Sequence, residues 1–578
     1  MDKMASSKAE TFEDLSQAPA ESFEEIEEVH IHAKTIIASV AICFMQFALV
    51  SATVGSGALG AVSTGLFGDS SKGPWLNTII LLFGVAGNPL FGQSVDLWGR
   101  KWIIVGTSFM GIIGSIIVSC AQNLATLIAG FCVIGISFTS QFCLLAIASE
   151  ILPRSHRGVG QVALSASTGF ALISGALACG ALTRGGHADN YRIFFYYVAA
   201  LYVVATLGLA FGYTPPAREL QQTLTTRQKV QRLDGVGMFL VSIGATLFCV
   251  GLQFSSTSGS WQDGRVLGPF VAGVTLMTVF GIYEWRFKKD GILHHDLFRH
   301  RNFALCVIIV GLEGLSFYTT NVFLILESTI VEGTDIFQAS LRLAIPCSVA
   351  SVVLLGIALL LTRFRRIREP LVFGFALLTI SPGLMSTITS SSGAGAFIGY
   401  PTLGVVGLQF ALASVAVGAQ FATPPDMIAV TSAVFAAGRS LGGAIGIAVN
   451  SALLSNALSS ELPKKIAAEV LPLGLEAASL PALISALMAN DQQALAAVPG
   501  ISPTIISAAA QGIKSGYAAS FRPAWIASAA FAAAGTIICM FVTNPMKEFT
   551  PHIDAPVEAE LIELQEKKEA LERRRQNC

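Results

Sequence analysis

The stretch Gly92–Trp102, with the sequence GQSVDLWGRKW, places Asp96, Arg100 and Lys101 between two long runs that carry almost no charge. The whole chain shares this bias: of its 578 residues, 53% are hydrophobic and 13% are charged. A soluble domain carries about 25% charged residues. The composition therefore predicts a membrane protein, in which these charges mark the end of one membrane span and the start of the next.

The apolar runs on either side of this stretch have the length of transmembrane helices. A bilayer core about 30 Å thick is crossed by roughly 20 apolar helical residues, and a helix satisfies its backbone hydrogen bonds without water. The sequence thus predicts an all-α integral membrane protein with fourteen transmembrane helices. The fourteen windows are 35–57, 75–94, 102–120, 124–145, 158–182, 192–213, 235–254, 266–285, 304–326, 340–362, 370–389, 396–418, 427–455 and 516–543.

Positive charge is distributed unevenly between the two sets of loops. Loops that follow even-numbered windows are rich in Lys and Arg, whereas loops that follow odd-numbered windows hold few. Because positive loops mark the cytoplasmic side, we expect both termini in the cytoplasm. The positive residues of the first set are Arg100, Lys101, Arg154, Arg157, Arg218, Arg227, Lys229, Arg232, Arg286, Lys288, Lys289, Arg299, Arg301, Arg363, Arg365, Arg366 and Arg368.

Three segments lie outside the predicted helices. Residues 1–33 form an acidic tail that we expect to be disordered, and residues 546–578 form a charged cytoplasmic tail. Between the last two windows, residues 456–515 are rich in Ala, Leu and Ser, with Pro and Gly breaks. We expect this insertion to be extracellular and to fold as short amphipathic helices over the mouth of the protein.

A weak internal repeat relates the two parts of the chain. The stretches SVDLWGRKWIIVG at 94–106 and LTRFRRIREPLVFG at 361–374 each follow one apolar window, carry a charge cluster and begin the next window. Pseudo-symmetric halves with a binding site between them are typical of secondary transporters. The repeat therefore favours a transporter.

Short motifs over about residues 35–545 resemble those of one transporter superfamily. Gly92, Asp96, Gly99, Arg100 and Lys101 have the spacing G-x-x-x-D-x-x-G-R-K, which resembles the cytoplasmic loop motif of the major facilitator superfamily. The chain is similar to the fungal fourteen-span drug:proton antiporters, near the trichothecene-efflux and siderophore-transporter branch. Further matches to that group are Trp75 and Pro89, Glu150 to Gly158, Tyr191 to Phe195, Arg232 to Gly237, Leu297 to Phe303 and Gly438 to Gly446.

The resemblance implies both an architecture and an activity. It implies a major facilitator fold with one six-helix bundle at 34–213, a second at 304–545 and two central extra helices within 214–303. It also implies a secondary active transporter that works by alternating access, as a monomer in the plasma membrane. The leading activity is proton-coupled efflux of a small organic molecule, such as a fungal secondary metabolite, toxin or drug. The alternative is uptake of a siderophore–iron complex.

The motif around Gly92 is implied to control conformational change rather than to bind substrate. In the family, such a cluster holds the cytoplasmic ends of spans from both halves together and breaks when the protein turns inward. Asp96 can accept backbone N–H groups at a helix N-terminus and pair with Arg100, while Lys101 can equally serve as a positive-inside anchor. We predict a gating role for Gly92, Asp96, Gly99, Arg100 and Lys101.

A carboxyl group inside the ninth window is the main candidate for a proton or substrate site. Glu313 lies well inside the window 304–326, where a charged side chain costs about 2.5–3.5 kcal/mol and normally faces a cavity or a partner. A cavity of low dielectric constant would favour its protonated form. We predict a proton or substrate site at Glu313 with Tyr318 and Asn321. The alternatives are an error in the predicted window boundary or a structural pair between Glu313 and Arg342.

A third group of residues is predicted to pack and couple the helices. Small residues allow helices to approach closely. Arg439 in the thirteenth window can support the structure, either by snorkelling to the membrane surface or by binding a carbonyl group. Two residues depart from the family pattern: Phe131 replaces an Arg linked to proton coupling, and Ala176 replaces the Pro of the antiporter motif. The packing and coupling group comprises Gly135, Glu150, Arg157, Gly175, Gly180 and Arg439.

Other classes of function lack their sequence signatures. The sequence has no Walker A motif for ATP-driven pumping, and no His, Asp or Ser constellation for catalysis gathers at one membrane face. The stretch GSGALG at 55–60 matches G-x-G-x-x-G, but it ends a membrane window and follows no strand. We expect no enzyme activity, no metal, no cofactor and no nucleic-acid partner. The expected partners are the bilayer, a small-molecule substrate and the proton whose gradient supplies the energy.

Overall fold

The computed structural model describes residues 33–68, 72–152, 157–215, 225–258, 262–288, 291–292, 294–423, 427–489, 493, 495 and 497–545. Regular structure in these ranges is helical throughout, and they contain no strand. The all-α prediction is therefore confirmed. The two predicted tails lie outside the described residues, except for Ala33, which begins the first helix.

Thirteen helices of the described ranges are long and apolar enough to cross a membrane. Large apolar side chains cover their outer surface: Phe211 is 82% exposed and Trp285 is 80% exposed, which suits positions that face lipid. The protein is therefore a multi-pass membrane protein. The spanning helices are α3 (Ala33–Ala58), α5 (Gly73–Trp98), α6 (Arg100–Ser119), the pair α7 (Leu124–Phe138) and α8 (Gln141–Glu150), α9 (Arg157–Thr183), α10 (Tyr191–Gly212), α13 (Gly235–Ser258), α14 (Gly264–Arg286), α15 (Arg301–Glu327), α16 (Ile336–Phe364), α18 (Ala394–Phe421), α19 (Ile428–Val470) and α22 (Pro503–Cys539).

The predicted window 370–389 forms a shorter helix that does not belong to this set. Helix α17 spans Arg368–Met385 and packs against α18 and α22. Its 18 residues begin with Arg368 and Glu369, and these two charges lower the mean hydropathy of the helix. Length and composition therefore support thirteen of the fourteen predicted membrane helices within the described ranges.

The fourth predicted span is interrupted near its middle. Helices α7 and α8 are separated by Thr139 and Ser140. The hydroxyl groups of Ser137, Thr139 and Ser140 each donate to the carbonyl three residues earlier, at 2.7 Å. Such local hydrogen bonds compete with the helical ladder. The clustering of three hydroxyl residues accounts for the break.

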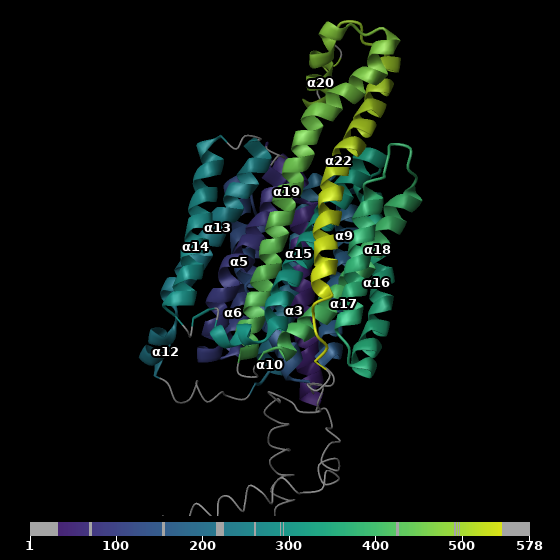
Figure 1. The fold of residues 1–578 in the computed structure, drawn as a ribbon. Coiled ribbons are helices and arrows are strands. Elements are labelled where there is room, and N and C mark those ends of the chain that lie inside the picture. The colour runs from purple at the N-terminus through teal and green to yellow at the C-terminus, as the bar shows by residue number, and fades with distance from the viewer. Residues whose placement is uncertain are drawn as a thin grey trace, which may run out of the picture.

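Two long contacts join the first half of the chain (α3–α10) to the second half (α15–α22). Helix α9 packs along α16, and α5 packs along α19. The hairpin of α13 and α14 lies on the flank of the bundle, where α13 contacts α5 and α19 (Figure 1). We call the end of the bundle where α5 meets α6 the basic end. The short helix α12 (Thr226–Arg232) also lies at this end (Figure 1).

The segment 456–515 continues two spans instead of folding back over the bundle. Helix α19 runs on to Val470 as one helix of 43 residues, and α22 begins at Pro503. Both project beyond the end opposite the basic end, and α20 (Leu480–Ala489) lies at the tip (Figure 1). A separate apolar core that includes Leu462 and Val470 holds this stalk together. The expectation of short helices alone is wrong, because apolar residues extend one face of α19.

Candidate functional site

The Gly92 motif forms the junction of α5 and α6 at the basic end. Gly99 ends α5 with a φ of 93°, a backbone conformation that favours glycine, and Arg100 begins α6. Gly92 lies where α5 meets α19, and a Cβ at this position would stand 2.6 Å from the Cβ of Ala433. The two motif glycines thus have separate roles: one permits the sharp turn, and the other permits close contact between the halves.

Lys101, Asp96 and Arg157 complete the predicted charges at this end. The Nζ of Lys101 lies 5.8 Å from the ring centroid of Trp102, which is 72% exposed, and this placement suits an anchor at the membrane surface. The backbone of Asp96 lies in the last turn of α5, and Arg157 is the first residue of α9. The side chains of Asp96 and Arg157 lie outside the described residues, so the pair of Asp96 with Arg100 stays a prediction.

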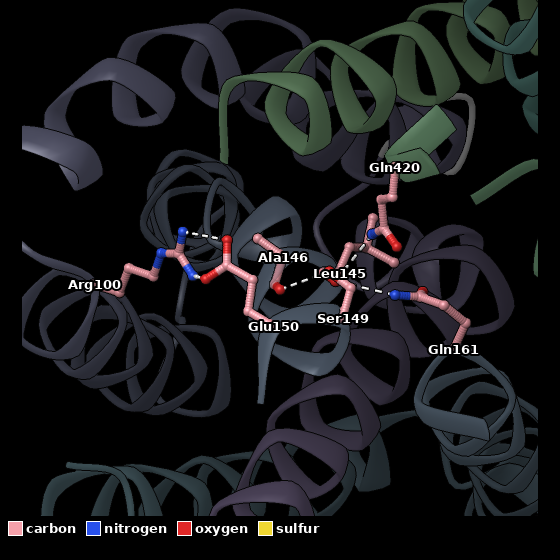
Figure 2. Close-up of polar contacts among 7 residues, drawn as sticks. All are labelled: Arg100, Leu145, Ala146, Ser149, Glu150, Gln161 and Gln420. Carbon is pink, nitrogen blue, oxygen red and sulfur yellow. Dashed lines mark hydrogen bonds and ion pairs between the residues drawn. The ribbon is translucent and has the colours of Figure 1, made fainter. Parts of the chain in front are cut away.

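Arg100 is buried and binds Glu150, the last residue of α8 (Figure 2). Its guanidinium group donates to both carboxylate oxygens, and Nη2 lies 2.6 Å from Oε1. The side chains are 7% and 1% exposed. Because a buried charge that loses its partner is strongly destabilising, the pair fixes the start of α6 against the end of α8. Glu150, which was predicted to pack and couple helices, thus has Arg100 as its partner.

One backbone carbonyl at the basic end joins three helices. The Leu145 oxygen of α8 accepts hydrogen bonds from Nε2 of Gln161 in α9, at 3.0 Å, and from Nε2 of Gln420 in α18, at 3.2 Å (Figure 2). Helices α8 and α9 belong to the first half and α18 to the second. The Gln420 bond therefore crosses between the halves and must break before they separate at this end.

The predicted site residue Glu313 is fully buried and binds Arg439. Nε of Arg439 lies 2.6 Å from one carboxylate oxygen of Glu313, and Nη2 lies 2.9 Å from the other. This two-pronged geometry is that of a strong arginine–carboxylate pair. Arg342 instead binds Glu332, at 2.7 Å and 3.1 Å. The alternative that paired Glu313 with Arg342 is wrong, and Arg439 holds a carboxylate rather than a carbonyl group.

Glycines make this ion pair possible, because they let α15 and α19 touch backbone to backbone. A Cβ on Gly442 of α19 would overlap the carbonyl group of Gly311, and a Cβ on Gly314 of α15 would overlap that of Arg439. The guanidinium carbon of Arg439 also lies 4.7 Å from the ring centroid of Phe317. The aromatic face therefore covers a charge that is already paired.

The two halves enclose a central cavity next to this pair. Its walls come from α3, α5, α7, α8 and α9 of the first half and from α15, α16 and α19 of the second. Its volume is about 40 Å³, which holds a few water molecules, whereas pockets for drug-sized ligands measure about 300–1,000 Å³. The halves must therefore separate to admit such a ligand. Among the described lining residues, Arg439 is the one charged side chain; the polar ones are Thr53, Asn77, Gln141, Thr168, Tyr318 and Asn321.

The other two predicted site residues, Tyr318 and Asn321, line the same cavity. The Tyr318 ring packs against Gly443, where a Cβ would overlap it, and its centroid lies 5.8 Å from the guanidinium carbon of Arg439. Asn321 donates to the Phe317 carbonyl at 2.9 Å. The structure thus gathers Tyr318 and Asn321 at the cavity wall, while Glu313 contacts the cavity through its partner Arg439.

A sequence model of the family described as fungal trichothecene efflux pump (TRI12) matches residues 10–574. The chain belongs to the TRI12 family. Relatives include the MFS-type transporter phomT of Diaporthe leptostromiformis, 27% identical over 64% of this chain and 62% of phomT. The chain thus spans less than two thirds of phomT. The trichothecene efflux pump TRI12 of Fusarium sporotrichioides is 23% identical, over 75% and 73% of the two chains. The efflux pump dotC of Dothistroma septosporum is 24% identical, over 90% and 86%.

Solved structures share the fold of this TRI12-family chain. The human organic anion transporter MFSD10 has a TM-score of 0.52 at 10% identity, over 88% of this chain and 100% of that one. A POT family transporter in complex with a thioalcohol-conjugated peptide has a TM-score of 0.53 at 14% identity, over 86% and 95%. The chain therefore has the fold of these transporters, the major facilitator fold.

The predicted packing glycines of this TRI12-family chain lie where helices approach closely. A Cβ on Gly135 of α7 would stand 2.5 Å from a phenylalanine ring of α5, and a Cβ on Gly180 of α9 would stand 2.7 Å from the Cα of Phe337 in α16. Gly175 of α9 faces Val54 of α3, at 3.2 Å from its would-be Cβ. Gly180 therefore lies in the contact between halves, whereas Gly135 and Gly175 pack helices within the first half.

Several buried polar residues of this TRI12-family chain were not among the predicted site residues. The available signal was an amide, hydroxyl or carboxyl group inside or at the edge of an apolar window, where polar side chains are costly and tend to be functional. Their partners lie far away in sequence and could not be read from it. The missed contacts are Gln46 with Thr168 at 2.9 Å, Asn450 with Thr319 at 3.2 Å, Ser528 with Asn450 at 3.4 Å and Trp525 with Glu327 at 2.8 Å.

Proposed function

We propose that the protein exports a neutral, oxygen-bearing organic metabolite by proton-coupled alternating access, and that it is not an enzyme. The proposal places it as a monomer in the plasma membrane, with the basic end and both termini in the cytoplasm. Positive loops at the basic end support this orientation. The relatives' names support export: two of the three described above are called efflux pumps.

The side chains that line the central cavity support a neutral substrate. Among its described residues, amide, hydroxyl and aromatic side chains surround one arginine, and Glu313 already neutralises that arginine. A cationic drug would find no free carboxylate there, and an anion would compete with Glu313 for Arg439. A neutral molecule with an apolar framework and a few hydroxyl or carbonyl groups suits such a lining best.

We propose that Tyr318, Asn321 and the pair of Glu313 with Arg439 form the substrate wall of the second half. Arg439 borders the cavity with its charge balanced by two hydrogen bonds to Glu313. The pair can therefore present N–H donors to a carbonyl or hydroxyl oxygen without demanding a charged substrate.

The gate of the proposed cycle is the basic end. Gly92 lets α5 pack closely on α19. Gly99 and Arg100 form the turn into α6, and Gln420 donates a hydrogen bond to the Leu145 carbonyl of the other half. Opening toward the cytoplasm breaks the cross-half contacts. Asp96→Asn is expected to abolish transport while membrane abundance stays unchanged. Normal flux in that variant would overturn a gating role for Asp96.

Purified protein in proteoliposomes tests the substrate class and the direction together. With an acidic lumen, a tritiated neutral trichothecene is expected to accumulate, and a protonophore is expected to abolish the accumulation. The cationic dye ethidium is the charged comparison probe, and it should not accumulate. Accumulation of ferric ferrichrome with an acidic exterior would instead establish the siderophore-uptake alternative and contradict the proposal.

A further inference from the structure

A line of buried polar side chains runs through the second half between α15, α19 and α22. Asn450 of α19 donates from Nδ2 to the Thr319 hydroxyl of α15 at 3.2 Å, and the Ser528 hydroxyl of α22 donates to its Oδ1 at 3.4 Å. The three side chains are at most 3% exposed. Hydroxyl and amide side chains of this kind commonly hydrogen-bond between membrane helices, whereas an ionisable group among them marks a functional site.

Glu327 lies at the end of this line that is further from the basic end. Its Oε2 accepts a hydrogen bond from Nε1 of Trp525 at 2.8 Å, and the residue is 1% exposed. Trp525 precedes Ser528 by three positions, so the two share one face of α22. The rings of Phe323 and Phe521 meet edge to face nearby. The carboxyl group is therefore shielded from solvent. Among the described residues, its hydrogen-bond partner is a neutral donor.

Among the described cations on the surrounding helices, none forms an ion pair with Glu327. On α16, Arg342 binds Glu332. On α22, Lys514 lies beside Gly333 and Arg522 is exposed. The other titratable groups nearby are Tyr517 on α22, whose ring packs near Phe521, and the pair of Glu461 with Lys464 on the α19 stalk. An ionised Glu327 would thus be a buried charge without a described countercharge, which is unfavourable.

The backbone next to Glu327 departs from a regular α-helix. Residues Ser328–Glu332 form a π-helical turn, which Gly333 ends with a φ of 73°. Such turns are rare and occur frequently at functional sites. The side chain of Thr334 donates to the Ser328 carbonyl at 3.0 Å and stabilises the turn. Glu327 therefore stands directly before a backbone irregularity of the kind found at functional sites.

We propose that Glu327 takes up and releases the coupling proton. This inference rests on the proposed proton-coupled export. In the step itself, hydronium gives its proton to the Glu327 carboxylate, leaving water and a neutral carboxyl group; the reverse step returns the proton to water on the other side. The hydrogen-bonded side chains of Ser528, Asn450 and Thr319 begin one helical turn from Trp525 on α22, and Thr319 is the residue after the cavity residue Tyr318 on α15. They therefore lie between Glu327 and the level of the cavity along these helices, and none of these three described side chains hydrogen-bonds to the carboxyl group itself.

Proteoliposomes test the coupling, with the tritiated trichothecene as the probe. Glu327→Gln keeps the shape and an oxygen that can accept the Trp525 bond, so the fold should persist. We expect this variant to exchange labelled for unlabelled trichothecene like the unaltered protein but to lose pH-driven accumulation by more than about tenfold, equivalent to about 1.4 kcal/mol. Glu461→Gln on the stalk is the matched control and should retain accumulation. Accumulation by Glu327→Gln at the unaltered level would overturn the proposal.

Infrared spectra of the purified chain and its variants, recorded without substrate and subtracted from one another, separate this inference from the proposed function. The purified chain is expected to show a protonated-carboxyl C=O band that disappears in Glu327→Gln, remains in Glu313→Gln and shifts in Trp525→Phe, which removes the N–H donor. If the trichothecene does not move at all, the export proposal fails, while the band still decides the role of Glu327. A band that persists in Glu327→Gln overturns the inference whether or not transport occurs.

Discussion

Helix α15 carries two buried glutamates whose charges are satisfied in opposite ways. Glu313 receives two hydrogen bonds from the guanidinium group of Arg439, whereas Glu327 receives one from the neutral indole of Trp525. The two residues are 14 positions apart, close to four helical turns at 3.6 residues per turn, so they lie on nearly the same face. Their different partners therefore follow from the helices that cover this face, α19 and α22.

The contrast separates a permanent charge from an exchangeable one. An arginine stays protonated throughout the physiological range, so Glu313 keeps a countercharge as long as α15 and α19 stay packed. Glu327 has no such countercharge among the described residues, and its charge state can follow the proton supply. The two glutamates lead to different expectations for substitution.

Arg439→Met removes the countercharge and makes Glu313 resemble Glu327. We expect a loss of about 3–5 kcal/mol in stability, because the carboxylate stays buried without its partner. Thermal unfolding in detergent measures the change. The double variant Arg439→Met with Glu313→Leu should recover much of the stability but none of the transport. A single variant as stable as the unaltered protein would show that the pair does not hold α15 on α19.

Glu150→Gln tests whether the buried pair of Arg100 with Glu150 supports stability as the pair of Arg439 with Glu313 does. The change leaves Arg100 charged and without its carboxylate at the basic end. We expect lower stability and a loss of transport of about tenfold or more, equivalent to about 1.4 kcal/mol, measured as initial flux per molecule in the membrane. Unchanged flux would show that transport does not depend on the pair of Arg100 with Glu150.

Gly442→Ala disturbs the contact of α19 with α15 next to Glu313 and leaves the surroundings of Glu327 unchanged. The added methyl group would overlap the Gly311 carbonyl, and we expect a loss of about 1–3 kcal/mol from overpacking. The matched control is Gly356→Ala in α16, where nothing lies within 4 Å of the added carbon. Equal melting temperatures for the two variants would contradict the close contact of α15 with α19.

Gln420→Ala and Gln161→Ala separate a contact between halves from one within a half. Both glutamines donate to the Leu145 carbonyl, and each bond contributes about 0.5–1.5 kcal/mol. Only Gln420→Ala should favour opening of the basic end, by about two- to twelvefold at that energy. Labelling of a cysteine placed at position 145 reports the opening. Equal labelling in the two variants would show that the Gln420 bond does not close this end.

The sequence predicts the helices well because the bilayer restricts what an apolar stretch of about 20 residues can do. It also places Gly99 between two spans, and the structure puts the turn from α5 into α6 at this residue, where a positive φ favours glycine. It places α17 in the same class as its neighbours, although Arg368 and Glu369 shorten its apolar part. It also fails at the stalk, where the Pro and Gly breaks suggest an end to α19 and the apolar face of Leu462 and Val470 extends it.

The partners of the site residues could not be predicted, because they depend on which helices meet. Arg439 lies 126 residues from Glu313, and Gln420 lies 275 residues from Leu145. Arg342 is a nearer cation to Glu313 in the sequence, yet it binds Glu332. A charge in an apolar window predicts that a partner exists; the glycine contacts of α19 determine which one it is.

Proton release on substrate binding tests the central contrast most directly. Purified protein in weakly buffered detergent solution, with a pH-indicator dye, is mixed with saturating neutral trichothecene. We predict that the unaltered chain and Glu461→Gln release protons, and that Glu327→Gln releases none while it still binds the labelled compound. Proton release by Glu327→Gln equal to that of the unaltered chain would contradict the assignment of the exchangeable charge to Glu327.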